Sequence, residues 1–250
     1  TRTATVSRRT FTSALVAIAL LSINVTSQAE LAVSPAGLEA SEGGTLSGPW
    51  PSSSRGMTII ASSTFDEIDG PIRVTGFNWR PDSSVSNGAV FGFDNLELIF
   101  SVTPREPAQL STTFAANLSG TLTVPTTVFD GPWSAEATSD SGQRPRPFDF
   151  KVPLTDPFEF DPADGNLLID FRFGSPIQGQ SAFDRDFSTY PDHKTQWGQS
   201  TSLASGQFVV PAQLEFEAVP EPSARTMTLF SLLAFVTWGR GTRKRMLRRE

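Results

Sequence analysis

Cysteine is absent from the 250 residues of this chain, and histidine and tyrosine occur once each. Without thiols the protein forms no disulfide, performs no thiol catalysis and offers no thiolate ligand to a metal. The single His193 cannot complete a zinc site alone, and its polar segment, Tyr190 to Lys194, predicts a surface loop. The Gly-x-Ser-x-Gly nucleophile elbow, a phosphate-cradling glycine loop and a dinucleotide fingerprint are also missing. We therefore expect no thiol, haem or zinc chemistry.

The net charge of −6 is distributed unevenly along the chain. Residues 1–29 hold three basic side chains and no acidic ones, whereas residues 223–250 hold seven basic ones and one acid. Residues 30–222 therefore keep 10 basic and 25 acidic side chains, a net charge of −15. A body of this charge repels nucleic acid and anionic lipid, so neither is an expected partner. The acidity is typical of a surface charge that keeps a protein soluble.

Turn-forming and aromatic residues are abundant, with 19 Gly, 19 Pro and 20 Phe. Apolar residues recur at every second position in several short runs, which is the period of a strand. The clearest runs are residues 96–102, 148–154, 167–173 and 214–218. In the third run, Leu168, Asp170 and Arg172 occupy the alternate positions and predict that the second face of this strand is largely solvent-exposed.

These strands, separated by polar turn clusters such as Asp161 to Asn166, predict an all-β fold. The simplest architecture is a single β-sandwich, jelly-roll-like, over residues 45–218. Residues 30–44 precede it as a loose leading segment, with an edge strand as the alternative for this Ser-, Gly- and Ala-rich part of the chain.

The N-terminal residues 1–29 have the parts of a signal peptide in the usual order. Basic Arg8 and Arg9 precede an uncharged, mostly apolar stretch that begins at Phe11, and small residues end at Ala29. This order predicts a signal helix, export, and cleavage by signal peptidase before Glu30. The sequence Ser-Arg-Arg-Thr-Phe at 7–11 resembles the twin-arginine signal. Thr12 departs from that pattern, so the twin-arginine and general routes both stay open.

The C-terminal residues 219–250 combine a proline motif, an uncharged run and a basic end. The motif is Val219-Pro220-Glu221-Pro222-Ser223, and the uncharged run extends from Thr226 to Gly239. The basic side chains that follow are Arg240, Arg243, Lys244, Arg245, Arg248 and Arg249. The order resembles the bacterial PEP-CTERM sorting signal.

That resemblance implies a short membrane-anchor helix that holds the precursor in the inner membrane, with its basic end in the cytoplasm. An exosortase-type processing enzyme would then cut near the motif. Physical arguments support this orientation, because prolines separate the anchor from the domain and cationic ends stay on the cytoplasmic side. The uncharged run of 14 residues covers about 21 Å against roughly 30 Å of hydrocarbon, so we expect a transient anchor.

The body resembles a group of uncharacterised PEP-CTERM proteins in four segments. These are residues 55–65, 77–81, 110–117 and 157–170. The last segment contains the sequence Pro-Phe-Glu-Phe-Asp-Pro followed by Gly-Asn-Leu-Leu-Ile-Asp. The resemblance covers most of the body, but it implies no known activity, because none is established for the group.

Acidic pairs spaced by two residues are the first candidates for chemistry, since two carboxylates on one strand face could serve a glycosidase. Such pairs also arise by chance in so acidic a chain, and wet strand faces carry them. Catalysis is therefore the minority interpretation. The pairs are Glu159 and Asp161, Asp184 and Asp186, and Glu215 and Glu217.

Asp161, Asp164 and Asn166 surround Gly165 and offer oxygen ligands of the kind calcium needs. The spacing is not that of an EF-hand, and a hairpin turn between two Phe-rich strands explains the same residues. Calcium is the one cofactor that the pattern leaves open.

Four tryptophans could form a sugar-stacking platform. Most of them neighbour Pro or Gly, which predicts loops, and loop tryptophans also cap the ends of sandwiches. They are Trp50, Trp79, Trp133 and Trp197.

Taken together, these features predict an exported, non-enzymatic protein that acts at the cell surface or in an extracellular exopolysaccharide matrix. Its expected partners are signal peptidase, an exosortase-type enzyme, the inner membrane transiently through the tail, and a polysaccharide. The alternative is a carbohydrate-binding or carbohydrate-cleaving module of the same fold.

Overall fold

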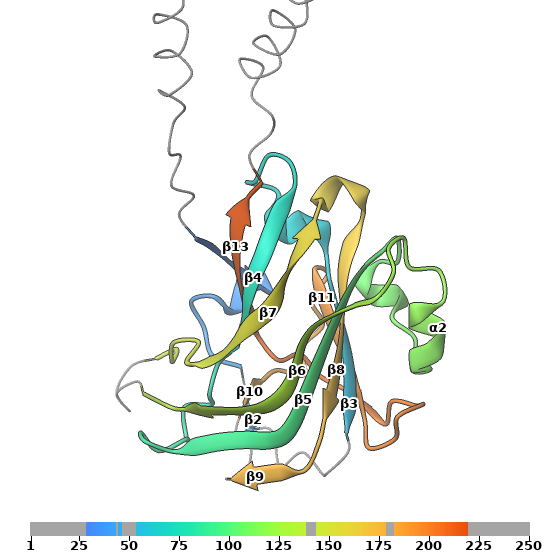
Figure 1. The fold of residues 1–250 in the computed structure, drawn as a ribbon. Helices are drawn as coiled ribbons and strands as arrows, with labels where there is room; N and C mark the ends of the chain where they lie inside the picture. Colours follow the sequence, from blue (N-terminus) through green and yellow to red (C-terminus); the bar gives the residue numbers. More distant parts are fainter. Residues whose placement is uncertain (1–28, 44, 47–53, 139–143, 179–182, 220–250) are drawn as a thin grey trace, which may run out of the picture.

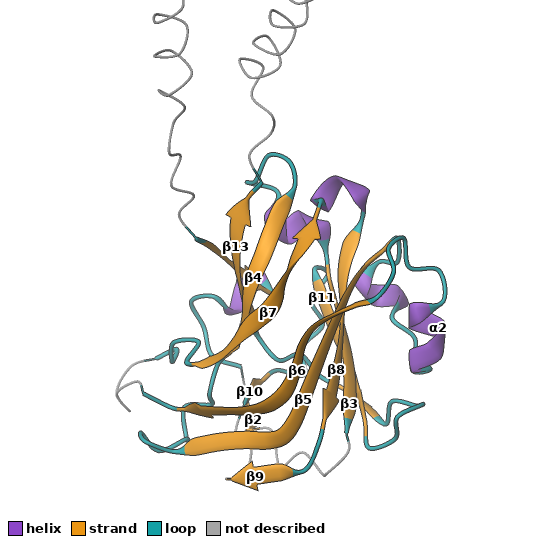
Figure 2. Ribbon diagram, viewed as in Figure 1, coloured by secondary structure: helices purple, strands orange, loops and turns teal. Residues whose placement is uncertain are grey.

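Two antiparallel sheets packed face to face make up most of the body, so the chain is an all-β sandwich (Figures 1 and 2). The computed structural model describes residues 29–43, 45–46, 54–138, 144–178 and 183–219. Aromatic and aliphatic side chains from both sheets fill the space between them. The prediction of an all-β sandwich is confirmed at this level.

The first sheet has four strands and brings the first and last strands of the body together. In spatial order it contains β1 (Glu30–Ser34), β13 (Ala212–Ala218), β4 (Ile72–Trp79) and β7 (Phe150–Phe160).

The second sheet has seven strands and contains the longest strand described, β5. Its spatial order is β12 (Gly206–Gln207), β11 (His193–Gly198), β3 (Arg55–Ile60), β8 (Asn166–Phe173), β5 (Val90–Thr103) and β6 (Thr126–Glu136), with β9 (Pro176–Gln178) also paired to β5.

Short elements connect the two sheets. A separate ribbon pairs β2 (Thr45–Leu46) with β10 (Asp184–Arg185). The helical elements are η1 (Ala36–Leu38), η2 (Ser62–Phe65), η3 (Pro107–Gln109), α2 (Phe114–Leu118) and η4 (Pro162–Asp164). No helix within the described ranges is long and apolar enough to cross a membrane, and the predicted anchor, 226–239, lies outside those ranges.

The period-two runs form the core as predicted. Leu96, Leu98, Phe100 and Val102 of β5 are each at most 2% exposed. The inward residues of β8 meet them across the ladder, since Leu98 pairs with Phe171 and Phe100 with Ile169. Alternation predicts this packing because successive side chains in a strand point to opposite faces.

The second face of β8 is buried, and our prediction that it is largely wet is wrong there. The segment with η3 and α2 covers it and forms a second apolar cluster of Met57, Ile59, Leu110, Phe114 and Leu168. Asp170 on the same face is 1% exposed and lies between two guanidinium groups, with Arg55 at 2.7 Å and Arg172 at 3.0 Å. Only Arg172 keeps a substantially exposed side chain.

The start of the body is a strand, so the edge-strand alternative describes residues 30–34 better than a loose leading segment. Glu30 to Ser34 pair with Phe216 to Ala212 of β13. Ala32 is 8% exposed and Ser34 is fully buried, so this strand contributes to the packed interior. The pairing partner lies about 180 residues away in sequence, which is why the local composition alone left both alternatives open.

The two lateral sides of the sandwich differ. On one side β6 and β7 lie together, and the indole Nε1 of Trp133 donates a hydrogen bond to the carbonyl of Lys151 at 2.9 Å. On the other side β1 is the outermost strand of its sheet, with η2 and the turn after it as its neighbours. A cleft lies on this second side.

Candidate functional site: the cleft beside β1

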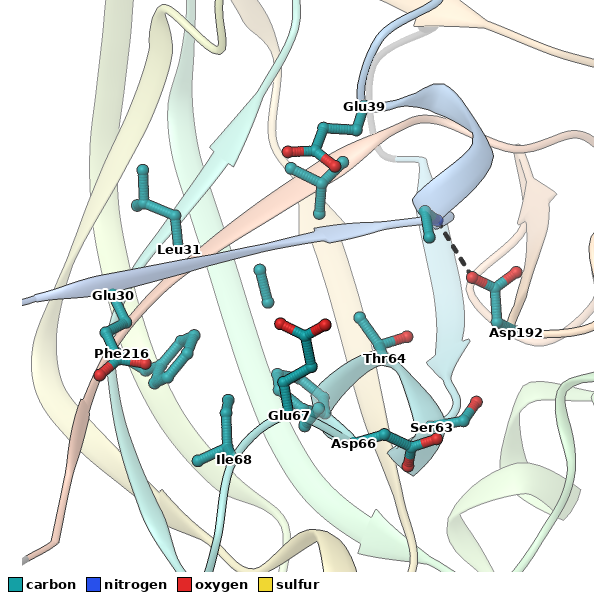
Figure 3. Close-up of a pocket in the computed structure, with 14 residues that line it drawn as sticks. Glu30, Leu31, Glu39, Ser63, Thr64, Asp66, Glu67, Ile68, Asp192 and Phe216 are labelled. Carbon is teal, nitrogen blue, oxygen red and sulfur yellow. Dashed lines mark hydrogen bonds between the residues drawn. The ribbon is translucent and has the colours of Figure 1, made fainter.

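The cleft runs along β1 and has a volume of about 530 Å³. Residues 30–33 form one wall, and residues 63–68, from η2 and the following turn, form the opposite wall (Figure 3). Ala36 and Asp192 lie at one end, where the amide of Ala36 donates to Oδ2 of Asp192 at 3.1 Å. Four parts of the chain that are far apart in sequence therefore build the site, the fourth being Phe216 of β13.

Carboxylates dominate the polar lining. Glu30, Glu39, Asp66, Glu67 and Asp192 line the cleft, and its 14 lining residues include no Lys, Arg or His. All except Asp192 are exposed. The cleft therefore presents a concentrated negative potential, which attracts cationic groups and repels anionic ones.

The floor of the cleft is apolar. Phe65 and Phe216 are 1% and 2% exposed, and their rings meet edge to face with centroids 6.2 Å apart. Phe65 is fixed from behind by Phe160, with ring centroids 5.3 Å apart. A ligand in this cleft would contact apolar surface below and carboxylates at the rim.

The buried His193 supports the end of β1 near the cleft. Its Nδ1 lies 2.9 Å from Oγ of Ser34, and its Nε2 lies 3.0 Å from Oγ1 of Thr195. Thr195 in turn hydrogen-bonds to Thr58 at 2.7 Å. Burial lowers the pKa of His193 to about 3, so the imidazole is neutral at ordinary pH. This chain of hydroxyls and imidazole links β1 to β11 and β3.

The prediction of His193 as a surface-loop residue is wrong. The residue begins β11, pairs with Ile60 of β3 and is 1% exposed. Ser34 is fully buried beside it, so the Ser34–His193 contact has no path for a substrate and serves packing.

A buried ion pair fixes the segment that follows η1. Arg80 and Asp184 are 0% and 1% exposed and approach within 2.6 Å. Arg80 also donates to the carbonyls of Leu38 and Ser41, and the amide of Gly43 donates to Asp184. Burial raises the pKa of Asp184, opposed by the Gly43 hydrogen bond and the Arg80 charge. The pair therefore holds residues 38–43 against the sandwich.

Two of the three candidate calcium ligands, Asn166 and Asp161, already have protein partners. Oδ1 of Asn166 accepts a hydrogen bond from the amide of Ser62 at 2.8 Å, and its Nδ2 donates to the carbonyl of Arg105. Oδ1 of Asp161 caps η4 by accepting from the amide of Ala163. The turn does not close a hairpin: β7 before it and β8 after it belong to different sheets. Within the described ranges, no group of three or more His, Cys, Asp or Glu residues could hold a metal ion.

The paired carboxylates do not converge on one another. Asp184 forms an ion pair with Arg80. Asp186 accepts hydrogen bonds from the amide of Ser188 at 2.6 Å and from the hydroxyl of Tyr190 at 2.8 Å. Glu159 lies beside Arg73, with 3.2 Å between Oε1 and Nη2. Glu215 accepts from the side-chain amide of Asn78 at 2.8 Å. Each of these four acids therefore makes a local contact of its own.

The three tryptophans in the described part of the chain are core residues, not an exposed platform. Trp79, Trp133 and Trp197 are 2%, 4% and 6% exposed, and the rings of Trp79 and Trp133 lie 5.5 Å apart. The prediction from neighbouring Pro and Gly failed because Trp133 and Trp197 lie within β6 and β11. Trp50 lies outside the described residues.

The predicted signal and sorting residues also lie outside the described part of the chain, apart from Ala29 and Val219 at its two ends. Sequence reasoning missed the cleft because its walls meet only in the folded chain. The one local signal was the acidic sequence Asp66-Glu67 directly after the segment 55–65.

Comparison with known proteins does not indicate a function for this chain. No family model and no curated protein matches this chain. A chain in the structure of infectious bursal disease virus Gt strain aligns with a TM-score of 0.18 at 13% identity. The alignment covers 86% of this chain, which spans about half (49%) of the viral one. A score this low supports no argument about fold or function.

Proposed function

We infer that the protein is an exported, non-enzymatic β-sandwich sorted by an exosortase-type system to the cell surface or an exopolysaccharide matrix. The observation that carries this proposal is where the body begins and ends. Glu30 pairs with Phe216, so β1 starts beside the end of β13 (Figure 1). The amide of Val219 then donates to the carbonyl of Pro71 at 3.0 Å. We call this end of the sandwich the chain-end pole.

The position of both chain ends at the chain-end pole supports sorting at a membrane. The predicted signal peptide would join the body at Glu30, and the sorting motif would join it at Val219. Either segment would therefore connect the chain-end pole of the sandwich to the membrane. The motif follows the last strand directly, and Pro220 and Pro222 cannot extend that strand's hydrogen-bond ladder. A protease at the outer face of the membrane would therefore meet the motif beyond the last strand and not the packed domain.

Several finer features belong to this proposal. They are the jelly-roll-like connection of the sheets, the signal helix, the anchor helix with its basic end at Arg240 to Arg249, and the absence of a resident cofactor. The alternative, a carbohydrate-binding or carbohydrate-cleaving module, has less support, because Trp79, Trp133 and Trp197 are packed in the core.

The test is the location of the protein in its native host after replacement of Pro220, Glu221 and Pro222 by Ala. We expect the variant to stay in the inner-membrane fraction, whereas the unaltered protein reaches the surface fraction. Glu217→Gln is the matched control, since it changes an acid next to the motif but within β13. Equal release of the triple variant and the control would contradict the proposal.

The export route has its own test. Replacing Arg8 and Arg9 by Lys should stop export if the twin-arginine route is used, because that route recognises the arginine pair. Export at the unaltered level would assign the protein to the general route and leave the sorting proposal standing.

A further inference from the structure

The free edge of β1 lies next to the cleft. β1 bonds only to β13 within the described sheet, and in an antiparallel pair alternate residues direct their N–H and C=O groups away from the partner. Such a row of unpaired groups is a template for an added strand. Residues 30–34 contain no proline, whereas the opposite side of the sandwich carries Pro153 and Pro157 in β7 and Pro132 in β6. Prolines protect that side from strand addition, and β1 has no such protection.

The cleft has the shape and surface that an extended chain requires. It follows β1 along residues 30–33, and Leu31, at 59% exposed, stands at its rim. A strand of five residues is about 17 Å long, comparable to β1 itself. Alternate side chains of an added strand would face the apolar floor at Phe65 and Phe216 and the acidic rim at Glu67. Phe216 and Glu67 are labelled in Figure 3.

The charge of the cleft decides between occupants. A second copy pairing through its own β1 would bring Glu30 and Glu39 of both molecules together around a shared edge, and like charges repel. Nucleic acid and anionic lipid are repelled for the same reason. A polypeptide with basic side chains complements the rim, and apolar residues at alternate positions complement the floor.

We propose that the cleft binds, as an added β-strand beside β1, an extended segment of another polypeptide in which basic and apolar residues alternate. Backbone hydrogen bonds to β1 supply the pairing, and the carboxylates select the charge. This inference stands independently of the sorting proposal, because it rests only on described residues of the body.

The experiment uses the full chain and three eight-residue peptides. The first alternates Lys and Val, the second has the same charges with two central Val residues replaced by Pro, and the third alternates Glu and Val. Fluorescence anisotropy at low salt should show saturable binding of the first peptide only. Pro removes the backbone donor needed for strand addition but keeps the charge, so this comparison separates pairing from general attraction.

Two matched protein variants locate the site. Asp66→Asn with Glu67→Gln removes two rim charges and should weaken binding about fivefold, the sum expected for two exposed ion pairs. Asp156→Asn with Glu159→Gln removes two exposed charges from β7 and should leave the dissociation constant unchanged. On binding, hydrogen exchange should slow at alternate amides of β1.

Three outcomes would overturn the proposal. They are equal binding of the Lys/Val and Pro-containing peptides, equal weakening by both protein variants, or no saturable binding at all. Either of the first two would show that the peptide binds through general electrostatic attraction and not as an added strand. The third would show that the cleft does not bind peptides of this class.

Discussion

Nδ1 of His193 lies 2.9 Å from Oγ of Ser34, and this contact joins β1 of the four-stranded sheet to β11 of the seven-stranded sheet. Both residues are buried, with exposures of 1% and 0%. The only histidine of the chain therefore sits between the two sheets at the end of the strand that borders the cleft.

His193 makes stability depend on pH. Burial lowers its pKa to about 3, below the ordinary value of 6.5. Since the unfolded chain binds the proton more readily, stability is lost as pH falls below about 6.5 and continues to fall until about pH 3. We expect this residue alone to remove about 3 kcal/mol of unfolding free energy between pH 7 and pH 4.

Denaturant unfolding of the unaltered protein and His193→Gln at both pH values measures the difference. The variant should lose less stability on acidification, because its side chain does not titrate. Should the variant fail to fold, a histidine NMR titration of the unaltered protein gives the pKa directly. An imidazole that titrates near 6.5 would contradict the prediction.

The Arg80–Asp184 pair predicts an asymmetry between single and double changes. Asp184→Leu leaves the guanidinium of Arg80 buried at 0% exposure without its carboxylate, which costs about 3–5 kcal/mol. Arg80→Met combined with Asp184→Leu removes both charges and should cost less than Asp184→Leu alone. Chemical denaturation measures both.

The exposed pair Arg73–Glu159 is the control for this cycle, with side chains 45% and 69% exposed. Replacing Glu159 by Gln should change stability by about 0–1 kcal/mol. A double variant less stable than Asp184→Leu would contradict the predicted asymmetry.

Gly56 allows the Trp197 ring to pack across β3. A Cβ at this position would overlap that ring, which is 6% exposed and stacked on Phe171 at 5.7 Å between centroids. Gly56→Ala should therefore cost about 1–3 kcal/mol and shift the tryptophan fluorescence. Gly206→Ala, where no atom lies within 4 Å of the added carbon, is the control. Equal melting temperatures for the two variants would refute this packing.

The turn at Asp161 to Asn166 should not bind calcium specifically, since Asn166 uses both of its side-chain atoms on backbone groups. Calorimetric titration of the unaltered protein and Asp164→Ala with calcium chloride should give the same weak heats. A stoichiometric isotherm that disappears in Asp164→Ala would establish the site.

Local pattern predicted the strands well and their burial less well. The alternation in β5, β8 and β13 identified the inward residues, such as Leu98, Ile169 and Leu214, because period two is a property of the strand itself. The burial of Asp170 and His193 depends on which distant segment covers them, namely α2 and β1. No local period contains that information.

The candidate site shows the same limit more strongly. The acids of the cleft were visible as a general excess of negative charge, but Glu30, Glu67 and Asp192 become neighbours only through the pairing of β1 and the position of η2. The sorting motif, in contrast, is defined by local sequence, and it stays a prediction here.

Mapping both ends of the protein in the native envelope tests the central claim most directly. The first peptide found by mass spectrometry should begin at or near Glu30, and none should extend beyond about Ser223. In a host without an exosortase, the tail through Arg249 should persist in the inner membrane. Released protein that retains Arg8 and Arg9 or the intact tail in the native host would contradict the account.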